Sequence, residues 1–530
     1  MNKKALLVLT VSILSMSLAA CGEKPQKSSE IVPSSEVSSS EVPSSQPVIS
    51  EDLSSAPVVS SETTVSSSEA MPSSQPASSV APISSSEAPA SSNELPISSE
   101  APISSSEEII DTSVDIVVNM PSYTDSAKTY DLTFTLDDYM FGYDSTYFNY
   151  ELAFLAFGNA VANQNKAMMN KFYKDGGFDH IYLSDTYDIT PTEDSIAYAF
   201  AHKVIFGGDT IFVSIRGFNY QKEWNDNFDL GLTGEHNGFA ARADEVKLAL
   251  DEYLSLSGYT HDVTLFISGY SRGGAVANLL AKRIDDVIEN DSDPIYSYLY
   301  AYTFEAPRGG IDDGKIYNNI FNVISSGDLV THVAPNQYGF VRYGTDVNLY
   351  SNDIDSAVKA FDPALELPAF VSTSDYANDK EFAEYIIESL TSFEGTGDEG
   401  DPRGCDTREK FANNYQPSIG YMMGLFFSLK SSTITSIKEG LENLTILQKM
   451  ALMMDDGIYN FLKPYIANDG VEYNDDELHT HCNVLLEFLR GPGQNLLLMM
   501  MSGDNSFSRT ILLHTPEVNY ALMLNNFNQE

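Results

Sequence analysis

The sequence predicts an α/β protein in which helices cover both faces of a mainly parallel sheet. Short apolar runs rich in β-branched residues alternate with longer segments of helical period. The clearest run, Thr210–Ile215, precedes a helical pattern over Ala240–Leu256. A second run, Val263–Ser268, leads through a glycine-rich turn into a helical segment, Ala275–Ile284. Strands joined by helices pair in parallel, because each helix returns the chain to the starting edge of the sheet.

Further elements flank this pattern. Thr129–Leu136 alternates apolar and polar residues and is predicted as an edge strand, whereas Tyr147–Phe172 has apolar residues at helical spacing. The segment Ser195–Ile205 shows no clear period. Two more short apolar runs, Tyr298–Phe304 and Ile320–Ser325, are predicted strands that extend the sheet.

The charge of the chain excludes one class of function. Its 530 residues include 75 acidic and 30 basic side chains, which gives a formal net charge of -45. Nucleic-acid binding depends on a basic face that displaces counterions from phosphates, so we expect no nucleic-acid partner. Residues 1–20 contribute about +2 and residues 21–112 about -12, which leaves about -35 on residues 113–530.

The N-terminus, residues 1–20, has the pattern of an export signal. Lys3 and Lys4 precede an apolar run that is too short to span a membrane comfortably. The run ends at Cys21-Gly22, and the sequence around this point resembles a bacterial lipobox. The resemblance implies cleavage before Cys21, lipidation of Cys21, and a protein anchored to the extracytoplasmic face of the cell membrane. Ordinary secretion is the alternative.

Residues 21–112 form a segment rich in Ser, Pro and Glu. A unit Ala-Pro-Ile-Ser-Ser-Ser-Glu begins at Ala81 and returns at Ala101, and aromatic residues are absent. Such a composition cannot bury enough apolar surface to fold, so we predict a disordered tether. A solenoid, the other reading of a repeat, would need regular apolar positions for stacking.

Residues 113–530 are predicted to form the folded domain, with a helical insertion over about 346–505. The insertion contains three apolar stretches, Tyr421–Phe427, Leu444–Met454 and Leu496–Met501. They fit either a helical core or a lid over an acyl-binding site. With Cys21 lipidated, Cys405 and Cys482 could form a disulfide in an exported protein.

A nucleophile motif occupies the turn after Val263–Ser268. Gly269-Tyr270-Ser271-Arg272-Gly273 fits the pattern Gly-x-Ser-x-Gly, with an apolar run before it and a helical segment after it. In this context the turn holds the serine in a strained conformation, and small flanking residues let strand and helix approach closely. A tight glycine-rich turn with a passive serine is the alternative.

Seven ordered blocks resemble the class 3 (fungal-type) triacylglycerol lipases and their bacterial relatives. One of them, Thr303-Phe304-Glu305-Ala306-Pro307-Arg308, resembles the family's Thr-Phe-Gly-x-Pro-Arg. The others are Ile211–Phe218, Trp224–Asn227, His236–Phe239, Gly269–Gly273, Asn322–Val330 and His514–Tyr520. The resemblance implies an α/β-hydrolase fold and lipase-like cleavage of acylglycerols. Much of Thr345–Arg509 matches no block.

By this resemblance, Ser271 is the nucleophile, Asp328 orients the base, and His514 is the general base and then acid. Asp328 follows the predicted strand Ile320–Ser325, so it should lie at the same sheet edge as Ser271. The oxyanion hole is expected to use the backbone N–H groups of Phe218 and Arg272. Two departures stand out: Phe218 replaces a small hydroxyl residue, and Arg272 brings a positive charge. We expect Arg272 to pair with a surface carboxylate, and the alternative is a place near an acyl or phosphate-bearing substrate.

The other histidines are weaker candidates for the base. His332 lies four residues beyond Asp328 and could compete with His514. His236 is expected to be structural by its motif, and His479 and His481 follow acidic residues as at a solvated helix start. The remaining histidines precede Ser271 and lack the required order, namely His180, His202 and His261. We expect His514 to follow a strand over Thr510–Leu513 and to sit on a loop.

The sequence therefore predicts a surface-anchored serine hydrolase that cleaves carboxylic esters, with a lipid or other ester as its substrate. No cofactor and no metal are expected, and the oligomeric state is not indicated. Acidic pairs such as Asp455-Asp456 are expected to be solvated rather than glycosidase carboxylates. The alternatives are a noncatalytic binding protein on the same fold and an esterase that acts on acylated carbohydrate.

Overall fold

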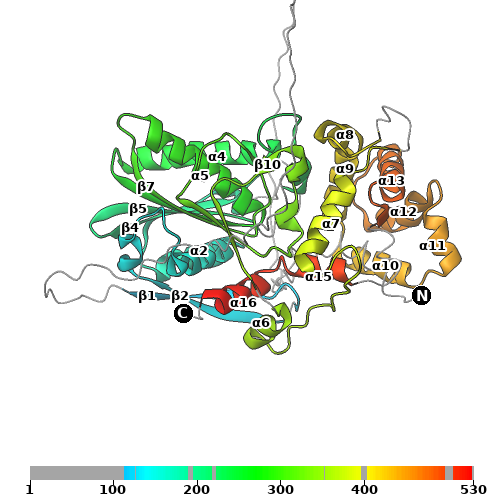
Figure 1. The fold of residues 1–530 in the computed structure, drawn as a ribbon, viewed down its shortest axis with the longest axis horizontal. Helices are drawn as coiled ribbons and strands as arrows, with labels where there is room; N and C mark the ends of the chain where they lie inside the picture. Colours follow the sequence, from blue (N-terminus) through cyan, green and yellow to red (C-terminus); the bar gives the residue numbers. More distant parts are fainter. Residues whose placement is uncertain are drawn as a thin grey trace, which may run out of the picture. The chain divides into compact units, whose positions relative to one another are not determined.

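The computed structural model describes residues 113–125, 127–188, 195–217, 223–350, 353–395, 403–495 and 505–527 (Figure 1). The predicted export signal, Cys21 and the predicted tether lie outside these residues. Within the described part, the main sheet has seven strands in the order β11-β9-β7-β6-β5-β4-β3. Their bounds are β3 Asp179–Leu183, β4 Tyr198–Ile205, β5 Gly208–Ile215, β6 Val263–Tyr270, β7 Tyr296–Phe304, β9 Ile320–Ile324 and β11 Thr345–Asn348.

The main sheet is mainly parallel. Strands β5, β6, β7, β9 and β11 pair in parallel, and β4 and β3 extend the sheet with antiparallel pairing. A two-residue turn, Phe206-Gly207, joins β4 to β5, and both of its residues have positive φ, 50° and 79°. Such a turn matches the twist of a hairpin. The segment Ser195–Ile205, which lacks a clear period in the sequence, thus contains strand β4.

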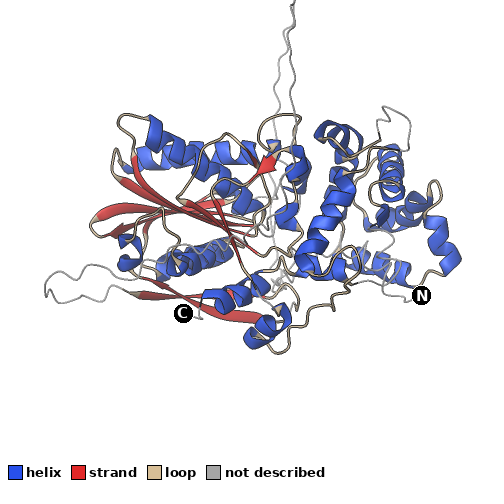
Figure 2. Ribbon diagram, viewed as in Figure 1, coloured by secondary structure: helices blue, strands red, loops and turns tan. Residues whose placement is uncertain are grey.

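Alternate residues of the central strands supply two hydrophobic cores, one on each face of the sheet. On one face, Ile211 and Val213 of β5 pack with helices α4 (Asn237–Ser257) and α5 (Arg272–Asn290). On the other face, Phe212 of β5 packs with helix α2 (Tyr150–Ala162). Figure 2 shows helices on both sides of the sheet. The predicted α/β class is confirmed.

The predicted edge strand lies outside the main sheet. It is β2 (Thr129–Leu136), and it pairs only with β1 (Val114–Pro121) in a separate antiparallel sheet. Its buried alternate residues join the same core as α2. The other elements of this half of the chain and its end are α3 Lys166–Asp175, β8 Gly310–Ile311, β10 Phe340–Val341 and α16 Pro516–Phe527.

The predicted insertion is helical. Its described helices are α6 Ile354–Phe361, α7 Asp379–Thr391, α8 Arg408–Asn414, α9 Gln416–Ser428, α10 Ser431–Glu442, α11 Ile446–Leu452, α12 Gly457–Asp469 and α13 Asp475–Arg490. Met422 and Phe426 of α9 belong to a core formed by these helices, so Tyr421–Phe427 contributes to packing. By contrast, Leu447 and Met450 of α11 are exposed. The stretch Leu496–Met501 lies outside the described residues.

The two cysteines of the described part are buried free thiols. Cys405 and Cys482 form no disulfide, so the suggestion that they pair is wrong for this structure. Cys482 instead packs in the helical core around α9 and α13. None of the helices among the described residues is both long and apolar enough to span a bilayer.

Candidate active site

Ser271 lies in a strained turn between β6 and α5. Strand β6 ends at Tyr270, α5 begins at Arg272, and Ser271 between them has φ 54° and ψ -127°. A residue with a side chain adopts this region at a cost, and such strain is concentrated at functional sites. The backbone N–H of Ser271 donates to the carbonyl oxygen of Phe304 at 2.8 Å, which fixes the turn against β7.

Glycine is required on both sides of Ser271. A Cβ atom at Gly269 would lie 2.2 Å from the carbonyl oxygen of Gly273. A Cβ atom at Gly273 would lie 2.3 Å from the carbonyl oxygen of Ile215 on the neighbouring strand. The pattern Gly-x-Ser-x-Gly therefore has a steric cause, since the turn closes tightly on itself and on β5.

Three of the predicted site residues meet at the carboxyl edge of the sheet. His514 Nε2 lies 2.8 Å from Ser271 Oγ, and His514 Nδ1 lies 2.6 Å from Asp328 Oδ2. Asp328 is fully buried beyond the end of β9, and its Oδ1 accepts the backbone N–H of Val330 at 2.8 Å. The result is one hydrogen-bonded chain from hydroxyl to imidazole to carboxyl.

The local structure before His514 differs from the expectation. Thr510–Leu513 is not a strand, because helix α15 (Ser506–Leu512) includes its first three residues and Leu513 caps that helix. A short apolar run fits a buried strand and a buried helix equally well, so sequence alone could not separate them. His514 lies in the short connection between α15 and α16, and the phenol of Tyr270 donates to its carbonyl oxygen at 2.9 Å.

The competing histidines have other contacts. His332 Nε2 faces the carbonyl oxygen of Ser326 at 3.1 Å, so it does not take the place of His514. His236 is buried and caps α4, where its Nδ1 accepts the backbone N–H of Phe239 at 3.4 Å. Burial lowers the pKa of His332 to about 4 and that of His236 to about 3, which keeps both rings neutral.

The electrostatic environment suits His514 to accept a proton. Burial lowers its pKa to about 4, so the imidazole is neutral near pH 7. Its Nδ1 faces the Asp328 carboxyl group, which directs Nε2 toward the Ser271 hydroxyl. A neutral, oriented imidazole beside a serine hydroxyl is the arrangement needed to activate a weak nucleophile.

Glu305 is a site residue that the sequence analysis did not identify. It follows β7 with φ 45°, is fully buried, and lies beside Asp328. One atom each of Glu305, Asp328 and His514 forms a group in which all distances are within 4.8 Å. One feature of the sequence could have pointed to Glu305: it stands where the lipase motif Thr-Phe-Gly-x-Pro-Arg has glycine. A glutamate with a left-handed backbone in that position calls for an explanation.

The predicted oxyanion-hole residues are only partly described. Phe218 lies outside the described residues, whereas Arg272 opens α5, at the positive end of the helix dipole. The Arg272 guanidinium is buried and donates to Ser195 O at 3.2 Å and to Asp226 Oδ2 at 3.1 Å. The expected surface ion pair is therefore wrong, because the guanidinium is buried and Asp226 is only 15% exposed. Burial raises the pKa of Asp226 to about 6, against the opposing effect of Arg272 and Arg242.

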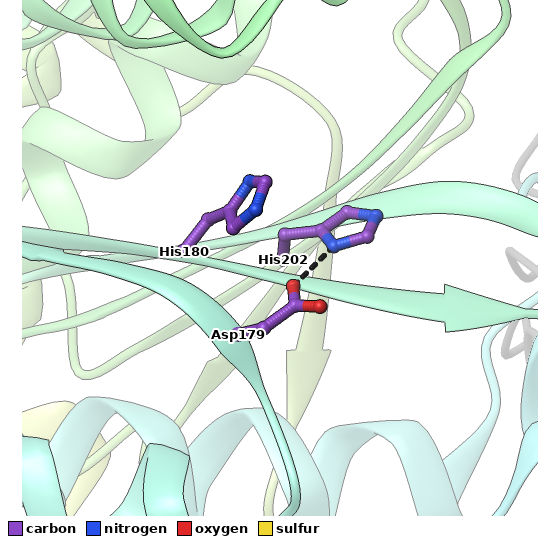
Figure 3. A group of neighbouring side chains, drawn as sticks. All are labelled: Asp179, His180 and His202. Carbon is purple, nitrogen blue, oxygen red and sulfur yellow. Dashed lines mark hydrogen bonds and ion pairs between the residues drawn. The ribbon is translucent and has the colours of Figure 1, made fainter.

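Two groups in the described part of the chain have the donor types for a metal ion. One is Glu305, Asp328 and His514, whose ring already bridges Ser271 and Asp328. The other is Asp179, His180 and His202, at the far antiparallel edge of the sheet (Figure 3). This second group shares no residue with the serine–histidine–aspartate chain.

Comparison with known proteins shows a family match over part of the chain. Residues 212–338 match the class 3 lipases. The matched segment contains Ser271 and Asp328, and His514 lies beyond it. A lipase of Caenorhabditis elegans is 28% identical over 126 residues, a match that covers 22% of this chain and 33% of that protein. The chain thus spans about a third of the length of this curated relative.

Solved structures of lipases match part of the chain at low identity. The Rhizomucor miehei lipase in complex with its propeptide is 19% identical, with a TM-score of 0.28 over 38% of this chain and 68% of that chain. Lipase II from Rhizopus niveus is 19% identical, with a TM-score of 0.26 over 38% of this chain and 77% of that chain. The functional inference therefore depends on the family match and on the geometry around Ser271.

Proposed function

We propose that this protein is a serine hydrolase that cleaves carboxylic esters, with acylglycerol lipids as its substrate class. The observation that carries the proposal is the hydrogen-bonded chain from Ser271 through His514 to Asp328. Its members come from three separate parts of the sequence, and the serine occupies the strained turn typical of esterase nucleophiles. The match to the class 3 lipases supports the ester substrate.

The geometry supports a two-step mechanism. Ser271 Oγ attacks the acyl carbon while His514 Nε2 takes its proton, and Asp328 stabilises the imidazolium that forms. The oxyanion of the tetrahedral intermediate would accept hydrogen bonds from the backbone N–H groups of Arg272 and Phe218. His514 then protonates the departing alcohol, which leaves the acyl group on Ser271. Water, activated by the same histidine, hydrolyses this acyl-enzyme and restores the serine.

We further propose that the enzyme is exported and held at the outer face of the cell membrane by a lipid on Cys21. The segment 21–112 would then act as a tether that projects the domain outward. A folded part with a charge of about -35 is repelled by anionic lipid, so an exogenous or soluble ester fits better than the host bilayer.

Hydrolysis of p-nitrophenyl esters from acetyl to palmitoyl tests the substrate class. A lipase-like site predicts activity that rises or persists with chain length and disappears in Ser271→Ala. Activity restricted to acetyl esters would favour an esterase of acylated carbohydrate, and no Ser271-dependent hydrolysis of any ester would leave a binding protein on this fold.

A further inference from the structure

Two buried carboxyl groups meet behind the histidine of the proposed active site. Glu305 and Asp328 are both 0% exposed, and one carboxyl oxygen of each lies within 4.8 Å of the other. Glu305 is held in place from two sides, since both of its oxygens lie 3.0 Å from the backbone nitrogen of Ser325 and Asn519 donates its side-chain amide to Oε1. The pair is therefore a fixed part of the structure rather than a chance approach of surface acids.

Such a pair must contain a proton. Two ionised carboxylates this close in a buried site repel each other and neither can donate a hydrogen bond, so one of them must be protonated. Burial and the nearby Asp328 raise the pKa of Glu305 far above its usual range. Asp328 accepts the Val330 N–H and faces His514 Nδ1, and both contacts favour its ionised form. The proton therefore belongs on Glu305.

Groups that face Glu305 from the surrounding elements are consistent with this assignment. They are Asp328 beyond β9, His514 before α16, Asn519 on α16 and the Tyr270 phenol at the end of β6. No cation of the described residues forms an ion pair with Glu305. An ionised Glu305 would thus place a second uncompensated negative charge beside Asp328, which a buried site strongly disfavours.

We infer that Glu305 is a positioning residue of this active site, a neutral carboxylic acid that donates its O–H to Asp328 and holds that carboxylate against His514 Nδ1. The inference rests on the proposed function, because it concerns the same serine–histidine–aspartate chain. Glu305 touches no substrate and acts through Asp328.

Two variants of Glu305 test this role. Glu305→Gln keeps a neutral donor of the same shape, whereas Glu305→Ala removes the donor. We expect Glu305→Ala to lower kcat about tenfold or more with little change in KM, and Glu305→Gln to restore most of the rate. The wild type should lose kcat at high pH, when the shared proton leaves, and Glu305→Gln should lack that loss.

Infrared spectroscopy supplies a readout that does not depend on activity. The wild type and Ser271→Ala should show the C=O band of a buried protonated carboxylic acid, and Glu305→Gln should lack it. Absence of that band in the wild type, or a folded Glu305→Ala with wild-type kcat, would overturn the positioning role. A wild type with the band but with no Ser271-dependent activity would overturn the proposed function instead.

A different observation concerns the antiparallel edge of the sheet, far along the strand order from Ser271. Asp179 on β3 pairs with His202 on β4, and a register shift follows Asp179. His180 has φ 43°, so the backbone there departs from a regular strand. Neighbouring strand residues normally point to opposite faces, and a bulge changes that direction. In Figure 3 the Asp179, His180 and His202 side chains consequently lie together.

These three side chains have the chemistry of a transition-metal site. One donor atom from each forms a group in which all distances are within 4.8 Å. His202 Nε2 lies 2.8 Å from Asp209 Oδ1, which orients the ring and directs Nδ1 toward Asp179. A carboxylate on the outer nitrogen of a ligating histidine is the usual support in metal sites. Asp179 is 65% exposed in its side chain, so an ion can enter from solvent.

We propose that Asp179, His180 and His202 bind a divalent metal ion of the zinc class, with water in the fourth position and Asp209 as the orienting partner. Two imidazoles and a carboxylate are the donor set that Zn²⁺ prefers over Mg²⁺ or Ca²⁺. The ion would link β3 to β4 and strengthen the edge of the sheet. This site departs from the expectation of no metal, which considered only sequence spacing.

Calorimetric titration of the full chain with Zn²⁺, together with the absorption of bound Co²⁺, tests the proposal. We expect one ion per chain, with binding lost in His180→Ala and in His202→Ala. His261→Ala is the matched control, because His261 is another exposed histidine beside an aspartate, Asp262. Binding that survives His202→Ala, or no binding by the wild type, would overturn the proposal and leave His202 as a ring that only contacts Asp179 and Asp209.

Discussion

His514 Nε2 lies 2.8 Å from Ser271 Oγ although 243 residues separate them in the chain. The contact is made because β6 delivers Ser271 to the carboxyl edge of the sheet, while the connection between α15 and α16 returns His514 to that edge. The phenol of Tyr270, next to Ser271, donates to the carbonyl oxygen of His514 and fixes this connection. The proposed chemistry depends on this long-range contact and on the contact of His514 with Asp328, 186 residues away.

Replacing the proposed base should abolish most of the activity. In His514→Ala, Ser271 loses its proton acceptor, so we expect kcat for ester hydrolysis to fall by roughly 10³-fold or more. His332→Ala is the control, because His332 faces Ser326 instead. A steady-state assay that found the larger loss in His332→Ala would show that the base is misassigned.

The pH dependence should reflect the buried imidazole. The active form has neutral His514, and burial lowers its pKa to about 4. Activity should therefore fall as the pH drops through about 4, not near the usual histidine value of about 6.5. A profile of kcat/KM between pH 3.5 and 8 checks this, and an acidic limb centred near 6.5 would mean that water reaches the ring.

The elbow glycines should not tolerate alanine. A Cβ atom at Gly273 would lie 2.3 Å from Ile215 O, so Gly273→Ala must displace β5 or α5 and should cost about 3 kcal/mol of unfolding free energy. Gly208→Ala is the control, because the atom nearest to a Cβ added at Gly208 is 3.5 Å away. Urea denaturation of Gly208→Ala should therefore show a change below about 1 kcal/mol. Equal stability of both variants would argue against the tight turn.

The charge of Arg272 should matter for stability more than for catalysis. Arg272→Met removes the nearer of two cations from the half-buried Asp226 and leaves only Arg242 beside it, which should cost about 2 kcal/mol of unfolding free energy. The backbone N–H remains, so kcat should stay within about tenfold. Arg490→Met is the control, since its partner Asp455 is largely exposed and the pair should contribute under about 1 kcal/mol. A drop in kcat of about 10³-fold with unchanged stability would instead assign the guanidinium to the reaction.

The features of the site that could be predicted are those that depend on residues adjacent in the sequence. The nucleophile turn needs only a strand, small residues around Ser271 and a helix, and all three are neighbours in the sequence. The strand before Asp328 was predicted for the same reason. The predicted strand before His514 was wrong, because a short apolar run does not distinguish a strand from a helix.

The features that escaped prediction depend on contacts between distant segments. Glu305 belongs to the site only because it is buried beside Asp328, and the sequence shows neither its burial nor that contact. Likewise, Asp179 and His202 meet only through the register of β3 on β4. Arg272 was expected to pair at the surface, and its partner Asp226 proved to be inside the fold.

The most direct test of the central claim is covalent labelling of the full chain with a fluorophosphonate probe. We predict one labelled site, at Ser271, with labelling lost in Ser271→Ala and strongly slowed in His514→Ala. Mass spectrometry of the labelled peptide identifies the residue. Absence of labelling in the folded wild type, or equal labelling of Ser271→Ala, would contradict the assignment of Ser271 as an activated nucleophile.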